Sequence, residues 1–218
     1  MEVKTPDELL KLLNAQVNQH IQARFKLPNI KQEDLEQMLL NCYEAEVVKR
    51  RMKFIQDNVT EGRIKKVAKW LTGEYKTGLL LYGASCGTGK TTIANAICTL
   101  ISYIYDGSYT GRKNVYKTTA INLVKLYSDN PDEYRSMANK ELLFIDDLGV
   151  EAVNIKVYGN EFSPVTELLY NRYDRNLVTI LTSNLSDEQM KDRYGARIDD
   201  RLREMFDKIH FQGPSYRK

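Results

Sequence analysis

The sequence predicts an α/β fold in which a parallel sheet is sandwiched between helices and is preceded by a small all-helical region. Residues 5–72 show only the periodicity of helices, with apolar side chains three or four positions apart. From Gly78 onward, short apolar runs alternate with helical stretches, which is typical of parallel strands joined by crossover helices. We therefore expect two domains, a helical one over residues 1–72 and an α/β one over residues 73–218.

Three helices are expected in the first domain. Thr5 and Glu8 form a capping box that starts the first helix, and an apolar stripe follows at Leu9, Leu13, Val17 and Ile21. The second helix is expected over about residues 31–57 and the third over residues 60–71. Because each helix has an apolar face of its own, we expect this domain to fold separately and to bind a protein partner.

The second domain is expected to contain five strands and four helical stretches. The strands are predicted at residues 78–82, 114–117, 141–146, 177–182 and 208–211. The helices are predicted at residues 90–105, 120–127, 164–174 and 186–206. Residues 152–162 are left as a loop to which the sequence assigns no role.

Composition limits the class of protein. No apolar run approaches the roughly 18–20 residues that a membrane span needs, and the N-terminus lacks the pattern of a secretory signal. The three cysteines, Cys42, Cys86 and Cys98, include no C-x-x-C pair, so a structural zinc site is not expected. Free thiols fit a reducing compartment. We therefore expect a cytoplasmic protein without a membrane partner.

Positive charge is concentrated in the first domain. Residues 1–72 contain 13 lysines and arginines against 10 acidic residues, so they hold the whole formal net charge of +3. The excess lies mainly in residues 49–53 and 63–69. It is explained either by a solvated helix face or by a surface for a partner or a nucleic acid.

The segment that follows the first predicted strand carries a phosphate-binding pattern. Residues 84–91, ASCGTGKT, match the P-loop, with Ala84 at a position where glycine is commoner. Glycines let main-chain N–H groups surround phosphate oxygens, and the next helix turns its positive end toward the same anion. Lys90 would contact the β- and γ-phosphates, and the Thr91 hydroxyl would bind Mg²⁺. The candidate ATP-binding residues are Gly83, Ala84, Ser85, Cys86, Gly87, Thr88, Gly89, Lys90, Thr91 and Thr92.

Two further strands end in polar side chains. Residues 142–147, LLFIDD, place two acids after an apolar run, and in a parallel sheet this end lies beside the phosphate loop. We expect Asp146 to hold the magnesium ion and Asp147 to orient the attacking water. Asn184, after the strand 177–182, could reach the γ-phosphate and this water, although a turn-forming role explains it as well.

Arginines are prominent near the C-terminus. Arg197 and Arg201 lie four residues apart in the segment 194–206, YGARIDDRLREMF, and so share one face of a predicted helix. Such a pattern is typical of a charged surface helix. At the edge of an ATPase domain it also suits an arginine that enters the active site of a neighbouring subunit.

Together, these motifs resemble the AAA+ ATPases of the DnaC/DnaI helicase-loader and IstB group. The resemblance covers about residues 75–218 and rests on CGTGKTT, LLFIDDLGVE, YNRYD, ILTSNLS, YGARIDDRLREMF and GPSYRK. It implies an AAA+ P-loop core, magnesium-dependent binding and hydrolysis of ATP, and self-association through AAA+ interfaces. It also implies contact with single-stranded DNA and with a replicative helicase. Because the sequence ends at Lys218, no separate lid is expected.

The resemblance also assigns roles to single residues. Asn184 matches the sensor-1 position, Arg201 matches the arginine finger, and Arg197 is a second candidate for the finger. Arg217 matches the C-terminal arginine that senses nucleotide. In residues 1–72 no resemblance to a particular helicase-binding domain is visible.

Three functions are compatible with the motifs. The first is a replication factor that loads a replicative helicase, and it is the one we expect. The second is an IstB-like transposition ATPase that binds DNA and activates a transposase. The third is a kinase for a small metabolite, which Asn184 and Arg201 disfavour, because a kinase does not need an arginine at a subunit edge.

Overall fold

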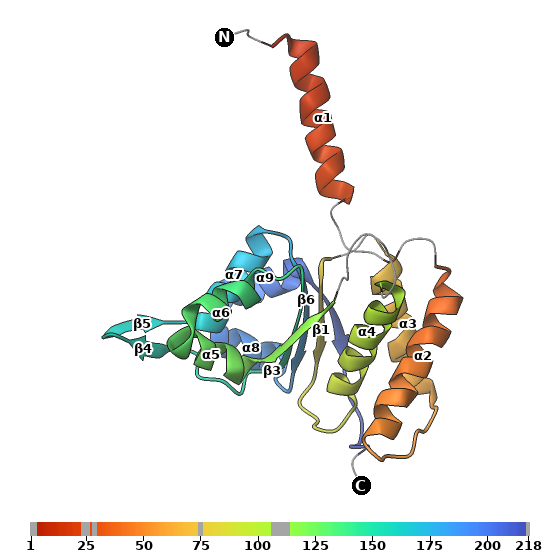
Figure 1. Cartoon of the computed structure of the whole chain (residues 1–218). Helices are drawn as coiled ribbons and strands as arrows, with labels where there is room; N and C mark the ends of the chain where they lie inside the picture. Colours follow the sequence, from red (N-terminus) through yellow and green to blue (C-terminus); the bar gives the residue numbers. More distant parts are fainter. Residues whose placement is uncertain (1–3, 23–26, 28–29, 74–75, 106–113, 217–218) are drawn as a thin grey trace.

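The computed structural model describes residues 4–22, 27, 30–73, 76–105 and 114–216 (Figure 1). The helices are α1 Pro6–Gln22, α2 Gln32–Lys49, α3 Asn58–Thr72, α4 Lys90–Tyr105, α5 Ala120–Asp129, α6 Pro131–Ala138, α7 Pro164–Asp174, α8 Asp187–Tyr194 and α9 Ala196–Met205. The strands are β1 Gly78–Tyr82, β2 Tyr116–Thr119, β3 Leu142–Leu148, β4 Ile155–Val157, β5 Asn160–Phe162, β6 Val178–Ser183 and β7 Phe206–His210.

The main sheet has the strand order β2-β3-β6-β1-β7, and every pair in it is parallel. In a parallel sheet all carboxyl ends lie at one edge, where ligands bind in α/β proteins. The end of β1 leads into the phosphate loop, and its neighbour β6 ends beside it. The sheet therefore brings together the motifs predicted to bind nucleotide.

Side chains from the two faces of the sheet enter two separate apolar cores. Leu79 and Leu81 of β1 lie in a core with α2, α3 and α4, whereas Leu80 lies in the core formed with α5 to α9. This alternation follows from the two-residue period of a strand. Helices consequently cover both faces, which is the expected sandwich (Figure 1).

The expected boundary between residues 72 and 73 does not separate two cores. Leu35 and Leu39 of α2 and Leu71 of α3 are almost fully buried, and they share one core with Ile97 of α4 and with the sheet. The apolar faces of α2 and α3, which the sequence assigned to a separate domain, are thus used to cover the α/β core. In the described chain, α2 and α3 are part of the α/β unit.

Helix α1 differs from α2 and α3. It projects away from the body (Figure 1), and its described side chains, residues 6–16, are all exposed. Four leucines, Leu9, Leu10, Leu12 and Leu13, are each 46–57% exposed. The side chains of Val17 and Ile21, also in the predicted stripe, lie outside the described ones. An exposed apolar helix face of this kind suits contact with a partner.

Several local elements depart from the expectations. The stretch expected over residues 186–206 is divided at Gly195 into α8 and α9. Helix α2 ends at Lys49 and not near residue 57, because Arg51 adopts a left-handed conformation, with φ 57°. Residues 131–138 form α6, which Asn130 caps by accepting from the N–H of Glu133 at 3.2 Å. The segment 152–162 contains an antiparallel hairpin, β4–β5. Among the described helices none is long and apolar enough to cross a membrane.

Candidate nucleotide-binding site

The phosphate loop joins β1 to the N-terminus of α4, as the sequence predicts. Lys90 is the first residue of α4 and is 7% exposed. Its ammonium group donates to the main-chain oxygens of Gly83, at 2.9 Å, and Ser85, at 2.8 Å. The lysine charge and the positive end of α4 therefore lie in the same loop, an arrangement that favours a bound anion.

Two glycines of the loop are required by its conformation. Gly83 has φ 143°, and a Cβ atom there would lie 2.4 Å from the main-chain oxygen of Phe211. Gly89 has φ 94°, and a Cβ atom there would lie 2.9 Å from the hydroxyl of Tyr43. Any other residue would strain the backbone and clash with its neighbours. These glycines hold the loop close to both α2 and the C-terminal segment.

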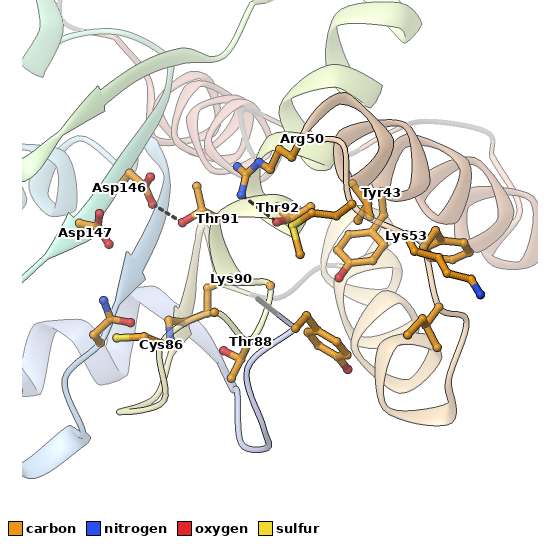
Figure 2. Close-up of a pocket in the computed structure, with 18 residues that line it drawn as sticks. Tyr43, Arg50, Lys53, Cys86, Thr88, Lys90, Thr91, Thr92, Asp146 and Asp147 are labelled. Atoms are coloured by element: carbon orange, nitrogen blue, oxygen red, sulfur yellow. Dashed lines mark hydrogen bonds between the residues drawn. The ribbon is translucent and has the colours of Figure 1, made fainter. Parts of the chain in front are cut away.

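Oxygen atoms that suit a magnesium ion as ligands lie close together beside the phosphate loop. The Thr91 hydroxyl donates to a carboxylate oxygen of Asp146 at 2.9 Å (Figure 2), and Thr182 of β6 donates to the same oxygen. Mg²⁺ prefers oxygen ligands and usually binds one or two protein groups together with water and substrate phosphates. A hydroxyl and a carboxylate at this spacing fit such an ion, which would bridge them to a nucleotide.

A bulge in β3 brings both acids of the LLFIDD segment to the cavity. The pairing of β3 with β6 shifts register between Ile145 and Leu148, and Asp147 has φ 56°. The Thr182 hydroxyl accepts from the N–H of Asp147 at 2.9 Å. In a regular strand, neighbouring side chains point to opposite faces, whereas a bulge turns one of them. Asp146 and Asp147 can therefore act on the same ligand.

The loop, the acids and α2 surround a cavity of about 340 Å³, within the usual size range of small-molecule sites (Figure 2). Ten of the residues that the sequence predicted line it: Cys86, Gly87, Thr88, Gly89, Lys90, Thr91, Thr92, Asp146, Asp147 and Asn184. Gly83, Ala84 and Ser85 belong to the loop but lie outside the lining, and Ser85 contributes its main-chain oxygen to Lys90. The structure thus brings the phosphate and metal candidates together.

The opposite wall comes from residues that the sequence analysis did not select. It consists of the end of α2 and the segment after it: Tyr43, Val47, Arg50, Met52, Lys53, Phe54 and Ile55. Arg50 donates to the Thr92 hydroxyl at 3.2 Å. Burial raises the pKa of Tyr43 to about 12, so its hydroxyl stays neutral. No local motif marks these residues; the basic run 49–53 was interpreted as a solvated helix face or as a surface for a partner or a nucleic acid, not as part of the nucleotide site.

The C-terminal segment closes a third side. The N–H of Tyr216 donates to the oxygen of Gly87 at 3.0 Å, and its hydroxyl donates to Asp57 at 2.9 Å. Tyr216 also lines the cavity. Arg217, the predicted nucleotide sensor, lies outside the described residues. Tyr216, the residue before it and the last described one, nevertheless lies at the phosphate loop.

Neither candidate finger lines this cavity. Arg197 and Arg201 lie on α9, and their guanidinium groups lie over the rings of Tyr170 and Tyr173 of α7. The described chain therefore does not bring Arg197 or Arg201 to its own phosphate loop.

No protein-family model and no curated protein matches the sequence. Among solved structures, a DnaC helicase loader is similar at 20% identity and a TM-score of 0.55, over 73% of this chain and 94% of that one. DnaI is similar at 20% identity and a TM-score of 0.55, over 73% of this chain and 88% of that one. AMPPCP-bound DnaA from Aquifex aeolicus is similar at 19% identity and a TM-score of 0.52, over 73% of this chain and 48% of that one. Likeness at these identities shows the fold alone: the chain shares the α/β fold of these structures, with the parallel sheet and the loop after β1 that its sequence predicts.

Proposed function

We propose that this chain is a magnesium-dependent ATPase that acts in DNA replication by binding a replicative helicase and loading it onto single-stranded DNA in the cytoplasm. The observation that carries the proposal is the cavity in which Lys90, Thr91, Asp146 and Asp147 meet. The structural likeness to a DnaC helicase loader and to DnaI supports the replication role.

The residues that the sequence predicted for the site have separate parts in the proposed hydrolysis. Lys90 and the N–H groups of the loop bind the phosphates, and the Thr91 hydroxyl and Asp146 hold the ion. Mg²⁺ would neutralise charge on the β- and γ-phosphates. Asp147 orients and deprotonates the attacking water, and Asn184 fixes its position. The family resemblance assigns nucleotide sensing to Arg217, which lies outside the described residues.

The proposed site is completed by a second copy of the chain. Phosphoryl transfer develops negative charge that an arginine stabilises, at a typical gain of about 10³–10⁵ in rate. Neither Arg201 nor Arg197 lines the cavity of its own subunit, so we assign Arg201, with Arg197 as the second candidate, to a neighbour's site. The chain would therefore hydrolyse ATP only in an assembly.

Mixing two inactive variants tests this assignment. Arg201→Ala keeps the phosphate loop and lacks the finger, whereas Lys90→Ala lacks the lysine of the loop and keeps the finger. Where light scattering shows that mixed assemblies form, the mixture should recover part of the phosphate release that each variant has lost. A mixture as inactive as its components would place Arg201 in its own subunit or in a structural role.

The partner is tested by affinity purification of the tagged full-length chain from its native host, followed by mass spectrometry. A replicative helicase should co-elute, and the Lys90→Ala variant should retain it if α1 makes the contact. Co-elution of a transposase without helicase would replace the loader by the transposition ATPase. Release of free phosphate, without a phosphorylated metabolite, separates either ATPase from a kinase.

A further inference from the structure

The arginines of α9 have different partners. Arg203 forms an ion pair with Asp199 at 2.7 Å. Arg201 forms none among the described residues, and its guanidinium carbon lies 4.0 Å from the ring centre of Tyr173 and 5.3 Å from that of Tyr170. The guanidinium carbon of Arg197 also lies 5.3 Å from the ring centre of Tyr170. Two arginines thus rest on aromatic rings, and one rests on a carboxylate.

This difference matters for a guanidinium that must act on phosphate. A carboxylate neutralises the guanidinium charge and occupies its N–H donors, whereas an aromatic face attracts the cation and leaves donors at its edge. The Nε atom of Arg201 is buried and has no hydrogen-bond partner in the described chain. Arg201 is therefore held in place within its own subunit while at least one of its N–H donors, the one at Nε, is not used.

The ring under Arg201 is itself fixed. The hydroxyl of Tyr173 donates to the Glu204 carboxylate at 2.6 Å, which ties α7 to the end of α9. This hydrogen bond, outweighing the opposite effect of Arg201, raises the pKa of Tyr173 and keeps the hydroxyl protonated. Tyr173 thus connects α7 to both Arg201 and Glu204 on α9.

We propose that Tyr173, assisted by Tyr170, is a positioning residue that restrains the guanidinium of Arg201, the group assigned above to the nucleotide site of a neighbouring subunit. The proposal rests on the role of Arg201 in trans that is proposed above. Tyr173 does not touch ATP. It acts by limiting the conformations of an arginine that has to cross an interface, which lowers the entropic cost of placing the charge.

The first experiment separates the ring from the hydroxyl. Tyr173→Leu removes the aromatic face, whereas Tyr173→Phe keeps the ring and removes the hydroxyl together with its bond to Glu204. Tyr103→Leu, at a tyrosine that is 73% exposed on α4, is the matched control. Tyr173→Leu should lower kcat about 3- to 10-fold, with affinity for a fluorescent ATP analogue unchanged. Tyr173→Phe should keep most of the activity, and the control should keep all of it.

The second experiment shows in which subunit the tyrosine acts. In the mixture of Lys90→Ala and Arg201→Ala, the Lys90→Ala subunit supplies the finger. Adding Tyr173→Leu to that subunit should reduce the recovered activity by the same 3- to 10-fold. Adding it instead to the Arg201→Ala subunit should leave the recovered activity unchanged, because that subunit supplies only the loop. A general structural defect would lower the recovered activity in whichever subunit Tyr173→Leu is placed.

The outcomes distinguish the positioning role of Tyr173 from the proposal on which it rests, the role of Arg201 as an arginine finger in trans. If Arg201→Ala hydrolyses ATP like the unmodified chain, Arg201 is not the finger and the role of Tyr173 fails with it. If Arg201→Ala is inactive but Tyr173→Leu has normal kcat, the finger stands and its positioning by Tyr173 is contradicted. The positioning role is also contradicted if the recovered activity falls when Tyr173→Leu is placed in the Arg201→Ala subunit, which supplies the loop. If Tyr173→Leu melts below Tyr103→Leu, the two mixtures still decide, because both contain the same three substitutions and differ only in which subunit carries Tyr173→Leu.

Discussion

The guanidinium of Arg63 in α3 donates to the main-chain oxygen of Thr88 in the phosphate loop at 2.9 Å. It also donates to the oxygen of Gln212 at 2.8 Å and lies 4.2 Å from the ring centre of Phe211. One buried side chain therefore connects α3, the loop and the C-terminal segment. A change at α3 would therefore reach the phosphate site through Arg63.

Arg63→Met is expected to weaken both stability and nucleotide binding. Methionine fills part of the space but leaves two main-chain oxygens without their charged donor, at a cost of about 1.5–3 kcal/mol. For a chain of this length each kcal/mol corresponds to roughly 2–4 °C in Tm. Affinity for ATP should fall about tenfold, because the loop is less fixed. Calorimetric melting and titration with a fluorescent ATP analogue measure the two effects.

Lys65→Met is the control, since Lys65 is exposed on the same helix. It should change neither Tm nor affinity. Equal affinity in Arg63→Met and the unmodified chain would mean that the loop holds its conformation without α3.

Lys90→Ala is expected to abolish nucleotide binding. The ammonium group is the charge that the loop presents to the β- and γ-phosphates, and it is already fixed by Gly83 and Ser85. The fluorescent ATP analogue should not bind at concentrations that saturate the unmodified chain. Lys125→Ala, at an exposed position of α5, should bind normally. Tight binding by Lys90→Ala would refute the assignment of the loop.

Asp147→Asn is expected to keep ATP binding and lose turnover. The bulge places this side chain at the cavity, and Asp146 accepts a hydrogen bond from Thr91. Loss of a general base costs about 10²–10⁴-fold in rate. Binding should change little, because the proposed magnesium ligands remain. Single-turnover hydrolysis measures the chemical step, and a normal rate would give Asp147 another role.

Local motifs were predicted from the sequence because neighbouring residues determine them. The phosphate loop, the acids near the end of β3 and the capping box at Ser186 all depend on contacts within a few residues. Helix α6 carried the same kind of signal, an Asn followed by proline, and was missed. The hairpin β4–β5 also had a local signal, since Gly159 is part of its two-residue turn, in which Tyr158 and Gly159 both adopt positive φ.

The remaining walls of the site could not be predicted, because they form by packing between distant segments. Arg63 meets Gln212 across 149 positions, and Asp57 meets Tyr216 across 159. No periodicity or spacing encodes such pairs. The same limit explains the domain boundary: the apolar faces of α2 and α3 are visible in the sequence, whereas the surface that they cover is not.

Helix α1 is expected to carry the contact with the proposed helicase. The double variant Leu9→Ser, Leu13→Ser removes two exposed leucines from one face, and burying a leucine contributes about 1.5–3 kcal/mol. Capture of the helicase by the full-length chain should fall at least about tenfold, while phosphate release without helicase stays the same. Lys11→Ser, on the opposite side of the helix, is the control. Undiminished capture by the double variant would move the contact to another surface.

Single-stranded DNA is expected to bind to the ATP-loaded assembly. The proposal follows from the loader function, in which repeated copies of the chain would form a positive groove along the strand. Each phosphate that lysine or arginine neutralises releases counterions, so the logarithm of the binding constant should fall linearly with the logarithm of salt concentration. For a single strand the slope is about 0.7 per neutralised phosphate. Fluorescence anisotropy of a labelled oligonucleotide at several salt concentrations measures this slope.

The nucleotide dependence of this binding separates an assembly effect from simple charge attraction. Adding a non-hydrolysable ATP analogue should raise the affinity of the unmodified chain for the oligonucleotide. Lys90→Ala keeps nearly the same net charge but cannot bind the analogue, so its affinity should stay at the nucleotide-free level. Equal binding by both proteins, with and without analogue, would assign the interaction to general positive charge, such as the excess in residues 1–72. No binding in either state would restrict the chain to contacts with its protein partner.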